Sequence, residues 1–142
     1  MWKDLIQNIS TGCIYGEPAS IEDIEVLEKL FSIQIPKELR NLLYETNGIN
    51  DSYGYSLIWS IEKITRENLN LGERLEDVYL PFNNLLFFAD ARNGDMVGYS
   101  ISDRSIKQND IYLWNHRNNE QTQIAPSLND FVEDWIRGKL SI

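Results

Sequence analysis

Cysteine and histidine are nearly absent from this sequence of 142 residues, which contains one of each, Cys13 and His116. A single cysteine excludes an internal disulfide, and a structural zinc site needs several cysteine or histidine ligands. We therefore expect no metal site. A catalytic pair of Cys13 and His116 remains geometrically possible, but coincidence is the simpler explanation for one residue of each type.

Long apolar runs and phosphate-binding loops are also missing. No segment approaches the roughly 18 consecutive apolar residues that a membrane helix needs. Residues 1–4, Met-Trp-Lys-Asp, lack the charged-then-apolar layout of a signal peptide. Neither GxGxxG nor GxxxxGK[ST] occurs, so nucleotide binding has no local support. We expect a cytoplasmic protein with no cofactor and no membrane partner.

Basic residues are few compared with acidic ones. The chain has 13 Lys and Arg residues against 22 Asp and Glu residues, which gives a net charge of −9. Direct binding to nucleic acid needs clustered positive charge against the phosphates, so this balance argues against nucleic acid as a partner. The same balance favours solubility or a basic protein partner.

Helical periodicity dominates the first half of the chain. Ser20 and Asp23 form a capping-box pattern ahead of an apolar stripe. Pro36 begins a second pattern as the first residue of a helix, and Gly48 supplies a left-handed stop after it. The predicted helices cover about residues 2–9, 21–31, 36–46 and 60–71.

Short segments rich in aromatic and β-branched residues replace this pattern in the second half. Turn residues such as Asn93-Gly94 and Asn118-Asn119 separate them, which is typical of an antiparallel meander. Ser127 and Asp130 then cap a final amphipathic helix. The predicted strands cover residues 85–89, 96–101, 111–114 and 121–125, and the last helix residues 128–136.

The order of these elements predicts the fold class. Helices come first, strands second and one helix last, which favours α+β over an alternating α/β arrangement. We predict an antiparallel meander sheet with the N-terminal helices and the C-terminal amphipathic helix packed on it. The length suits one domain over residues 1–142.

Two carboxylates near residue 90 are the main candidates for chemistry. The segment from Asp90 to Asp95 superficially resembles a calcium loop, but Arg92 and Gly94 occupy positions where oxygen ligands belong. A glycine-containing hairpin turn is the simpler interpretation. Acid/base catalysis by Asp90 and Asp95 would require burial and partner groups, yet no nucleophile, metal or phosphate motif accompanies them. We predict no catalytic residues.

The aromatic residues divide into two groups. Trp114 ends a predicted strand and Trp135 lies on the apolar stripe of the last helix, so we expect both in the core. Tyr53, Tyr55 and Trp59 instead cluster in a glycine-containing stretch between two predicted helices. That setting suits contact residues held at a surface as well as it suits core residues, because Trp and Tyr are enriched in both.

Ordered motifs along nearly the whole chain resemble those of the SUKH superfamily. They are a capped helix, an Ile-Pro junction, a second helix and a terminal Asn-Gly, then a sheet segment and a closing strand-helix segment. The corresponding sequences are SIEDIEVLEKLFSIQIPKELRNLLYETNGI, SLIWSIEKITREN, LLFFADARNGDMVGYSI and DIYLWNHRNNEQTQIAPSLNDFVEDWI. Each motif is loose, so their order and spacing carry the resemblance.

This resemblance implies an α+β fold, no catalytic residues and a protein-binding role. The superfamily includes fungal regulators of cell-wall synthesis and many bacterial immunity proteins, which neutralise toxins that are often nucleases. The compact length resembles that of the bacterial members. We therefore expect an immunity protein that binds one basic, nuclease-like toxin. The alternative is a regulatory or scaffold module that binds a host protein. A third hypothesis is an enzyme that uses buried carboxylates near Asp90 and Asp95.

Seven residues are predicted to contact the partner. Three aromatic residues would offer apolar area as anchors, and four carboxylates would act as charge decoys for the basic residues of a toxin. The predicted anchors are Tyr53, Tyr55 and Trp59, and the predicted acidic contacts are Glu76, Asp77, Asp90 and Asp95.

Overall fold

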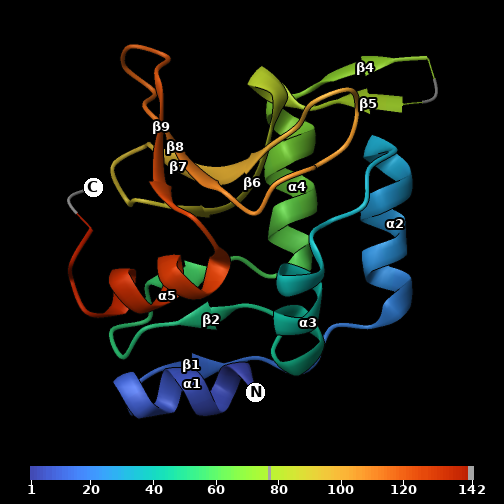
Figure 1. Cartoon of the computed structure of the whole chain (residues 1–142). Helices are drawn as coiled ribbons and strands as arrows, with labels where there is room; N and C mark the ends of the chain where they lie inside the picture. Colours follow the sequence, from blue (N-terminus) through green and yellow to red (C-terminus); the bar gives the residue numbers. More distant parts are fainter. Residues whose placement is uncertain (77, 141–142) are drawn as a thin grey trace.

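The computed structural model of the chain describes residues 1–76 and 78–140 (Figure 1). The helices in this part of the chain are α1 (Trp2–Ile9), α2 (Ile21–Phe31), α3 (Lys37–Glu45), α4 (Ile61–Leu71) and α5 (Leu128–Ile136), with a one-turn 3-10 segment η1 (Phe82–Asn84). The strands are β1 (Ile14–Tyr15), β2 (Ile49–Asn50), β3 (Ser56–Ile58), β4 (Glu73–Leu75), β5 (Val78–Leu80), β6 (Leu85–Asp90), β7 (Met96–Ser100), β8 (Ile111–Trp114) and β9 (Gln121–Ala125). None of these helices is long and apolar enough to cross a membrane.

Serine caps begin three of the helices. The hydroxyl oxygens of Ser20, Ser60 and Ser127 accept hydrogen bonds from the backbone N–H three residues further on, at 3.1, 3.2 and 3.2 Å. Each bond satisfies one of the N–H groups that a helix start leaves without a partner. The predicted starts of α2, α4 and α5 are thereby confirmed.

The predicted boundaries of α3 need correction. Pro36 is the residue before the helix rather than its first residue, because its ψ of 143° is not helical. At the other end Thr46 is extended, so the helix ends without a left-handed cap. Gly48 has a φ of +90° but lies in the following turn, where a β-carbon would come within 2.9 Å of the Ser60 nitrogen. Close approach of the two backbone segments therefore requires this glycine.

The predicted meander is present. Strands β6, β7, β8 and β9 form an antiparallel sheet in sequence order, which confirms the α+β fold class. Two further sheets, β1-β2-β3 and β4-β5, were not predicted. Their strands have two or three residues each, too few for an alternating pattern to show in the sequence.

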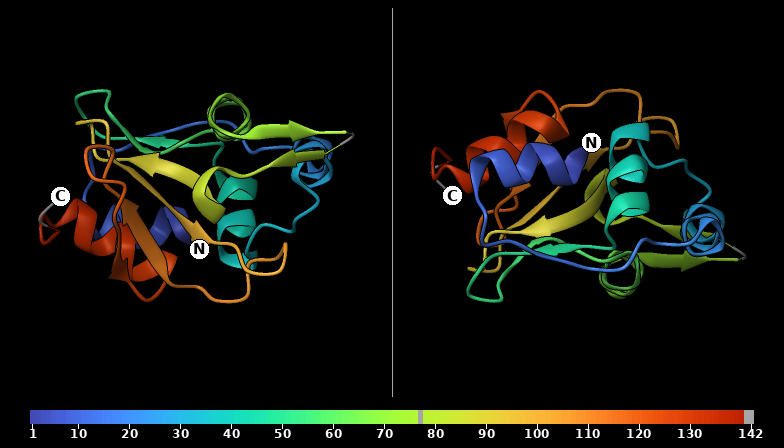
Figure 2. Two further views of the ribbon diagram at one scale, coloured as in Figure 1. Left: turned by 90° about the horizontal axis from the view of Figure 1, so that it is seen from above. Right: turned by 90° about the horizontal axis from the view of Figure 1, so that it is seen from below.

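The main sheet lies between helices (Figures 1 and 2). Helix α4 covers one side, and α5, with α1 beside it, covers the other. Strand β6 is consequently buried on both faces, and Leu85 to Ala89 are at most 1% exposed. The β1-β2-β3 sheet adjoins this strand, because the backbone N–H of Trp59, just beyond β3, donates to the Phe88 carbonyl at 2.9 Å.

A buried asparagine joins α4 to β6. The side chain of Asn68 accepts from the Phe87 N–H at 2.9 Å and donates to the Phe87 carbonyl at 2.8 Å. It also donates to the Ile64 carbonyl at 2.7 Å. Asn68 thus takes the place of a neighbouring strand for one residue of β6, beside the irregular register between Phe87 and Ala89.

Replacement of this asparagine should destabilise the whole domain. Asn68→Ala leaves the N–H and the carbonyl of Phe87 buried without partners, so we expect the free energy of unfolding to fall by about 2–4 kcal/mol. Chemical denaturation measures this change. Asn70→Ala, at an exposed position of the same helix, should change stability by less than about 0.5 kcal/mol. An equal decrease in the free energy of unfolding in both variants would contradict the role of Asn68 as the partner of the Phe87 backbone.

Candidate functional site

A tight turn between β2 and β3 presents two tyrosines to solvent. One carboxylate oxygen of Asp51 accepts hydrogen bonds from the backbone N–H groups of Tyr53 and Tyr55, at 2.9 and 3.0 Å. Gly54, with a φ of +89°, completes the turn. The side chains of Tyr53 and Tyr55 are left 86% and 56% exposed. Large exposed aromatic side chains on a turn fixed by its own hydrogen bonds are suited to contact a protein partner.

Arg92, from the turn between β6 and β7, packs onto this tyrosine turn. Its guanidinium donates to the second carboxylate oxygen of Asp51 at 2.9 Å. The guanidinium carbon lies 4.6 Å from the ring centre of Tyr55 and 5.9 Å from that of Trp135, within cation–π range. We call Asp51, Tyr53, Tyr55, Arg92 and Trp135 the tyrosine–arginine surface.

The charge of Asp51 is stabilised by these contacts. Desolvation by itself raises the pKa of the Asp51 carboxyl, but the hydrogen bonds from the backbone of Tyr55 and Tyr53 and the charge of Arg92 outweigh it, so the pKa lies below its usual value. Asp51 therefore stays ionised at neutral pH. The turn and the Arg92 side chain are held together by that charge.

Two clefts flank Arg92. One, of about 640 Å³, is lined by a mixture of polar and apolar groups, with Asn47, Asn50, Lys63 and Asp90 among the polar ones. The other, of about 330 Å³, lies beside Cys13 and Trp135. Burial raises the pKa of the Cys13 thiol, which disfavours its reactive thiolate form. The clefts give a partner concave surface on either side of the exposed tyrosines.

Trp59 and Asp90 hold Arg92 in place from inside the protein. Trp59 is 2% exposed, and its indole N–H donates to Asp90 at 2.8 Å. The other oxygen of the Asp90 carboxylate accepts from the backbone N–H of Arg92 at 2.9 Å. Lys63 lies 5.2 Å from the Trp59 ring centre and 3.9 Å from Asp90. The burial of Trp59 leaves it no apolar area to offer as the predicted anchor, and Asp90 serves first to position the turn.

Asp95 closes the same turn from its other end. It is 8% exposed, and one of its carboxylate oxygens accepts from the backbone N–H of His116 at 3.1 Å and contacts the Nδ1 atom of that ring. The ring packs on Gly94, where a β-carbon would come within 3.0 Å of it. Asp95 thus links the β6–β7 turn to the β8–β9 turn, and it presents little carboxylate to a partner.

The remaining predicted acidic contacts lie elsewhere. Glu76 is exposed on the turn between β4 and β5, at the opposite end of the protein from the tyrosine turn (Figures 1 and 2). Asp77 falls outside the described residues. Of the seven predicted contact residues, the structure brings together Tyr53 and Tyr55 at the surface, with Trp59, Asp90 and Asp95 beneath or beside it.

Sequence reasoning missed Asp51 and the role of Arg92. An aspartate two residues before a turn residue is a known turn-forming pattern, so Asp51 left a local signal. No local pattern in the sequence indicates the role of Arg92, because its ion-pair partner Asp51 is 41 residues away. Within the described residues, no group of three or more His, Cys, Asp or Glu side chains is arranged to hold a metal ion.

The chain was compared with protein families, curated proteins and solved structures. The SUKH_6 family model, described as SMI1-KNR4 cell-wall, matches residues 21–132. No curated protein matches the chain. The crystal structure of an uncharacterized protein from Salmonella enterica subsp. enterica serovar typhimurium str. 14028s is similar, with a TM-score of 0.54 and 13% sequence identity over 100% of this chain and 80% of that chain. At this identity the likeness concerns the fold alone.

Removal of the Asp51 carboxylate should loosen the tyrosine turn without unfolding the protein. Asp51→Ala loses two acceptor bonds and the ion pair to Arg92, so we expect severalfold faster amide hydrogen exchange at Tyr53 and Tyr55. NMR measures the exchange residue by residue. Ser52→Ala, at the exposed neighbouring position, is the control and should leave both rates unchanged. Unchanged rates in Asp51→Ala would show that the turn does not depend on this side chain.

The Asp95 contact should make stability depend on pH. Burial raises the pKa of Asp95, but the bonds from the His116 ring and backbone and the charges of His116 and Arg117 bring it below its usual value. A lowered carboxyl pKa stabilises the fold above the unfolded-state pKa, and this contribution disappears as the pH falls through the folded-state value. Asp95→Asn should therefore cost about 2 kcal/mol at pH 7, and the difference from wild type should shrink below about pH 4.

Thermal unfolding across this pH range tests the expectation. Asp103→Asn is a matched control, since the Asp103 side chain is 87% exposed, and it should shift the midpoint little at any pH. If Asp95→Asn lowers the thermal midpoint by the same amount at every pH, the shape of the side chain matters for stability and its charge does not.

Proposed function

Because the chain belongs to the SUKH family described as SMI1-KNR4 cell-wall, we propose that it is a non-catalytic binding protein that neutralises a bacterial protein toxin by covering it. Members of this family are generally non-catalytic and have binding roles of the immunity or cell-wall-regulator kind. The tyrosine–arginine surface carries the proposal, because it combines exposed aromatic side chains with a backbone already held in place.

The residue types of this surface are those that dominate protein interfaces. Tyr, Trp and Arg are enriched among binding hot spots. Tyr and Trp offer a large contact area with few freely rotating bonds, and the planar guanidinium of Arg offers several hydrogen-bond donors. Tyr53 and Tyr55 are fixed at the backbone by Asp51, and Arg92 is fixed by Asp51 and Asp90. A partner would therefore bind without a large entropic cost of ordering this surface.

The overall charge supports a basic partner. A toxin that acts on nucleic acid must present Lys and Arg to phosphates, and a protein of net charge −9 attracts such a surface over a distance. Glu76 and its sequence neighbour Asp77 remain proposed acidic contacts. Asp90 and Asp95 contribute through the position of Arg92. Inhibition would follow from occlusion, with cytoplasmic binding of the toxin before it reaches its substrate.

A regulatory or scaffold module is the second candidate. The family description, SMI1-KNR4 cell-wall, favours it, and the same surface would serve a host protein. Affinity capture from the source organism at low and moderate salt separates the two functions. An immunity protein should retain one toxin and abolish its activity on mixing, whereas a regulatory module should retain host cell-wall or signalling proteins and protect no cell from a toxin.

Substitution of the two tyrosines tests the surface. Tyr53→Ala and Tyr55→Ala should each weaken binding of the captured toxin by about tenfold, with an unchanged thermal midpoint because both side chains are exposed. Titration calorimetry measures the affinity. Val26→Ala removes a similarly exposed apolar side chain, 55% exposed on α2, and should leave binding unchanged. A captured toxin that keeps its activity when bound, or full affinity in both tyrosine variants, would contradict the proposal.

A further inference from the structure

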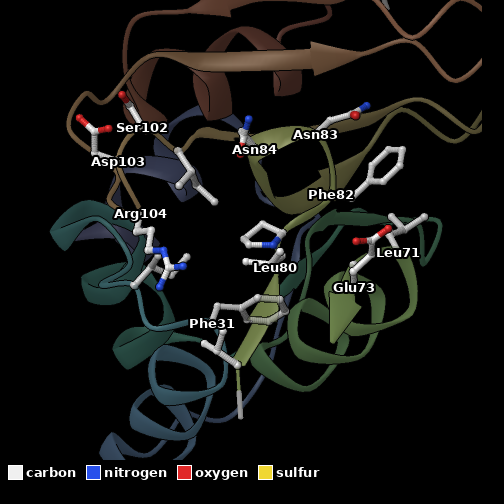
Figure 3. A pocket seen from close by; sticks show the side chains of 15 residues that line it. Phe31, Leu71, Glu73, Leu80, Phe82, Asn83, Asn84, Ser102, Asp103 and Arg104 are labelled. Carbon is white, nitrogen blue, oxygen red and sulfur yellow. The ribbon is translucent and has the colours of Figure 1, made fainter. Parts of the chain in front are cut away.

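A groove of about 690 Å³ opens at the end of the protein away from the tyrosine turn. It lies between the C-terminal end of α2, the β4–β5 hairpin, η1 and the segment after β7 (Figure 3). No residue of the tyrosine–arginine surface lines it. Its size falls within the range of about 300–1,000 Å³ that is usual for binding pockets.

The floor of the groove is apolar. Phe31, Ile33 and Ile101 line it and are 3%, 5% and 9% exposed. Phe82 stands at the edge of the groove with its ring against Trp114, at 5.2 Å between ring centres. Leu80 also lines the groove and is only partly buried, so it retains apolar surface there. An apolar side chain of a partner would bury this surface and displace water from it.

Opposite charges stand on the two sides of this floor. Figure 3 shows the Arg104 side chain on one side of the groove and Glu73 on the other. Both residues are exposed, and neither forms an ion pair with any other residue of the described ranges. A ligand that carries both a negative and a positive group would complement the two sides.

One wall of the groove is a strand with a free edge. Among the described residues β5 pairs with β4 alone, so its other edge has no neighbouring strand. The hairpin packs against α2, where the rings of Tyr79 and Phe31 lie 6.2 Å apart, so β5 is held in place while its outer edge has no strand partner in the described part of the chain. The opposite wall is a turn with both Asp103 and Arg104 at positive φ, closed by two hydrogen bonds between Ser102 and Ser105 at 2.8 and 3.0 Å. A wall of this kind is already ordered before a ligand arrives.

We propose that the groove binds an extended segment of a protein partner as a third strand on β5. The segment places an apolar side chain on the floor, an acidic residue toward Arg104 and a basic residue toward Glu73. Main-chain hydrogen bonds to a strand edge supply affinity in this mode of recognition, and the side-chain contacts supply specificity. The proposal stands whether the partner is a toxin or a host protein, because it concerns a different surface from the tyrosines.

NMR titration of the isotope-labelled full chain with designed peptides tests this proposal. The probes are acetyl-Lys-Val-Leu-Val-Asp-amide and acetyl-Asp-Val-Leu-Val-Lys-amide, which allow for both strand directions. The control is acetyl-Lys-Ser-Gly-Ser-Asp-amide, which keeps the charges and lacks the apolar side chains. We expect saturable shifts for at least one probe at Val78, Leu80, Ile101 and Arg104, at peptide concentrations in the millimolar range, and none for the control.

Charge reversal in the protein provides the second arm. Arg104→Glu should weaken the better probe about fivefold and should bind acetyl-Lys-Val-Leu-Val-Lys-amide more tightly than the wild type does. Glu73→Lys should also weaken the probe. Arg117→Glu, an exposed arginine on the β8–β9 turn, should change nothing, and the dispersion of the spectra shows that each variant is folded.

Three results would overturn the proposal. The first is the absence of any saturable shift at 5 mM peptide, and the second is equal affinity of Arg104→Glu and wild type for every probe. The third is self-association of the unliganded chain that Arg104→Glu abolishes, measured by sedimentation velocity, because a second copy of the chain would then be the occupant. Shifts confined to Tyr53, Tyr55 and Arg92 count as an absence of groove binding.

Discussion

The structure depends on how the backbone of β6 is satisfied. This strand is buried on both faces, so each of its N–H and carbonyl groups needs a partner inside the protein. Strand β7 supplies partners on one edge. On the other edge the side chain of Asn68 forms hydrogen bonds with both the N–H and the carbonyl of Phe87, and the backbone N–H of Trp59 donates to the Phe88 carbonyl. These contacts fix α4 and the strand β3 relative to the main sheet.

The same strand positions the candidate contact surface. Its last residue, Asp90, accepts from the buried indole of Trp59 and from the backbone of Arg92. Arg92 then reaches Asp51, which holds the turn that exposes Tyr53 and Tyr55. A chain of hydrogen bonds therefore runs from the core to the exposed tyrosines. Residues that looked like contacts in the sequence act as supports within this chain.

Electrostatics operates at two distances. Near the tyrosines the carboxylates of Asp51 and Asp90 are offset by Arg92 and Lys63, so contact there depends on aromatic area and hydrogen bonds. Further away the excess of acidic residues produces a net charge of −9, which acts on the approach of a basic partner. The groove beside β5 is different again, because its two charges stand on opposite sides of an apolar floor.

The α+β class, the helices with serine caps and the four-stranded meander can all be predicted from the sequence, because they rest on local periodicity and turn residues. Tyr53 and Tyr55, which the sequence proposes as contacts, are exposed in the structure. The buried hydrogen bonds of Trp59, Asp90 and Asp95, the packing of Arg92 on the tyrosine turn and the groove beside β5 become visible only in the folded chain. Burial and ion pairing between residues tens of positions apart leave no local signal, since they arise only when distant segments pack together.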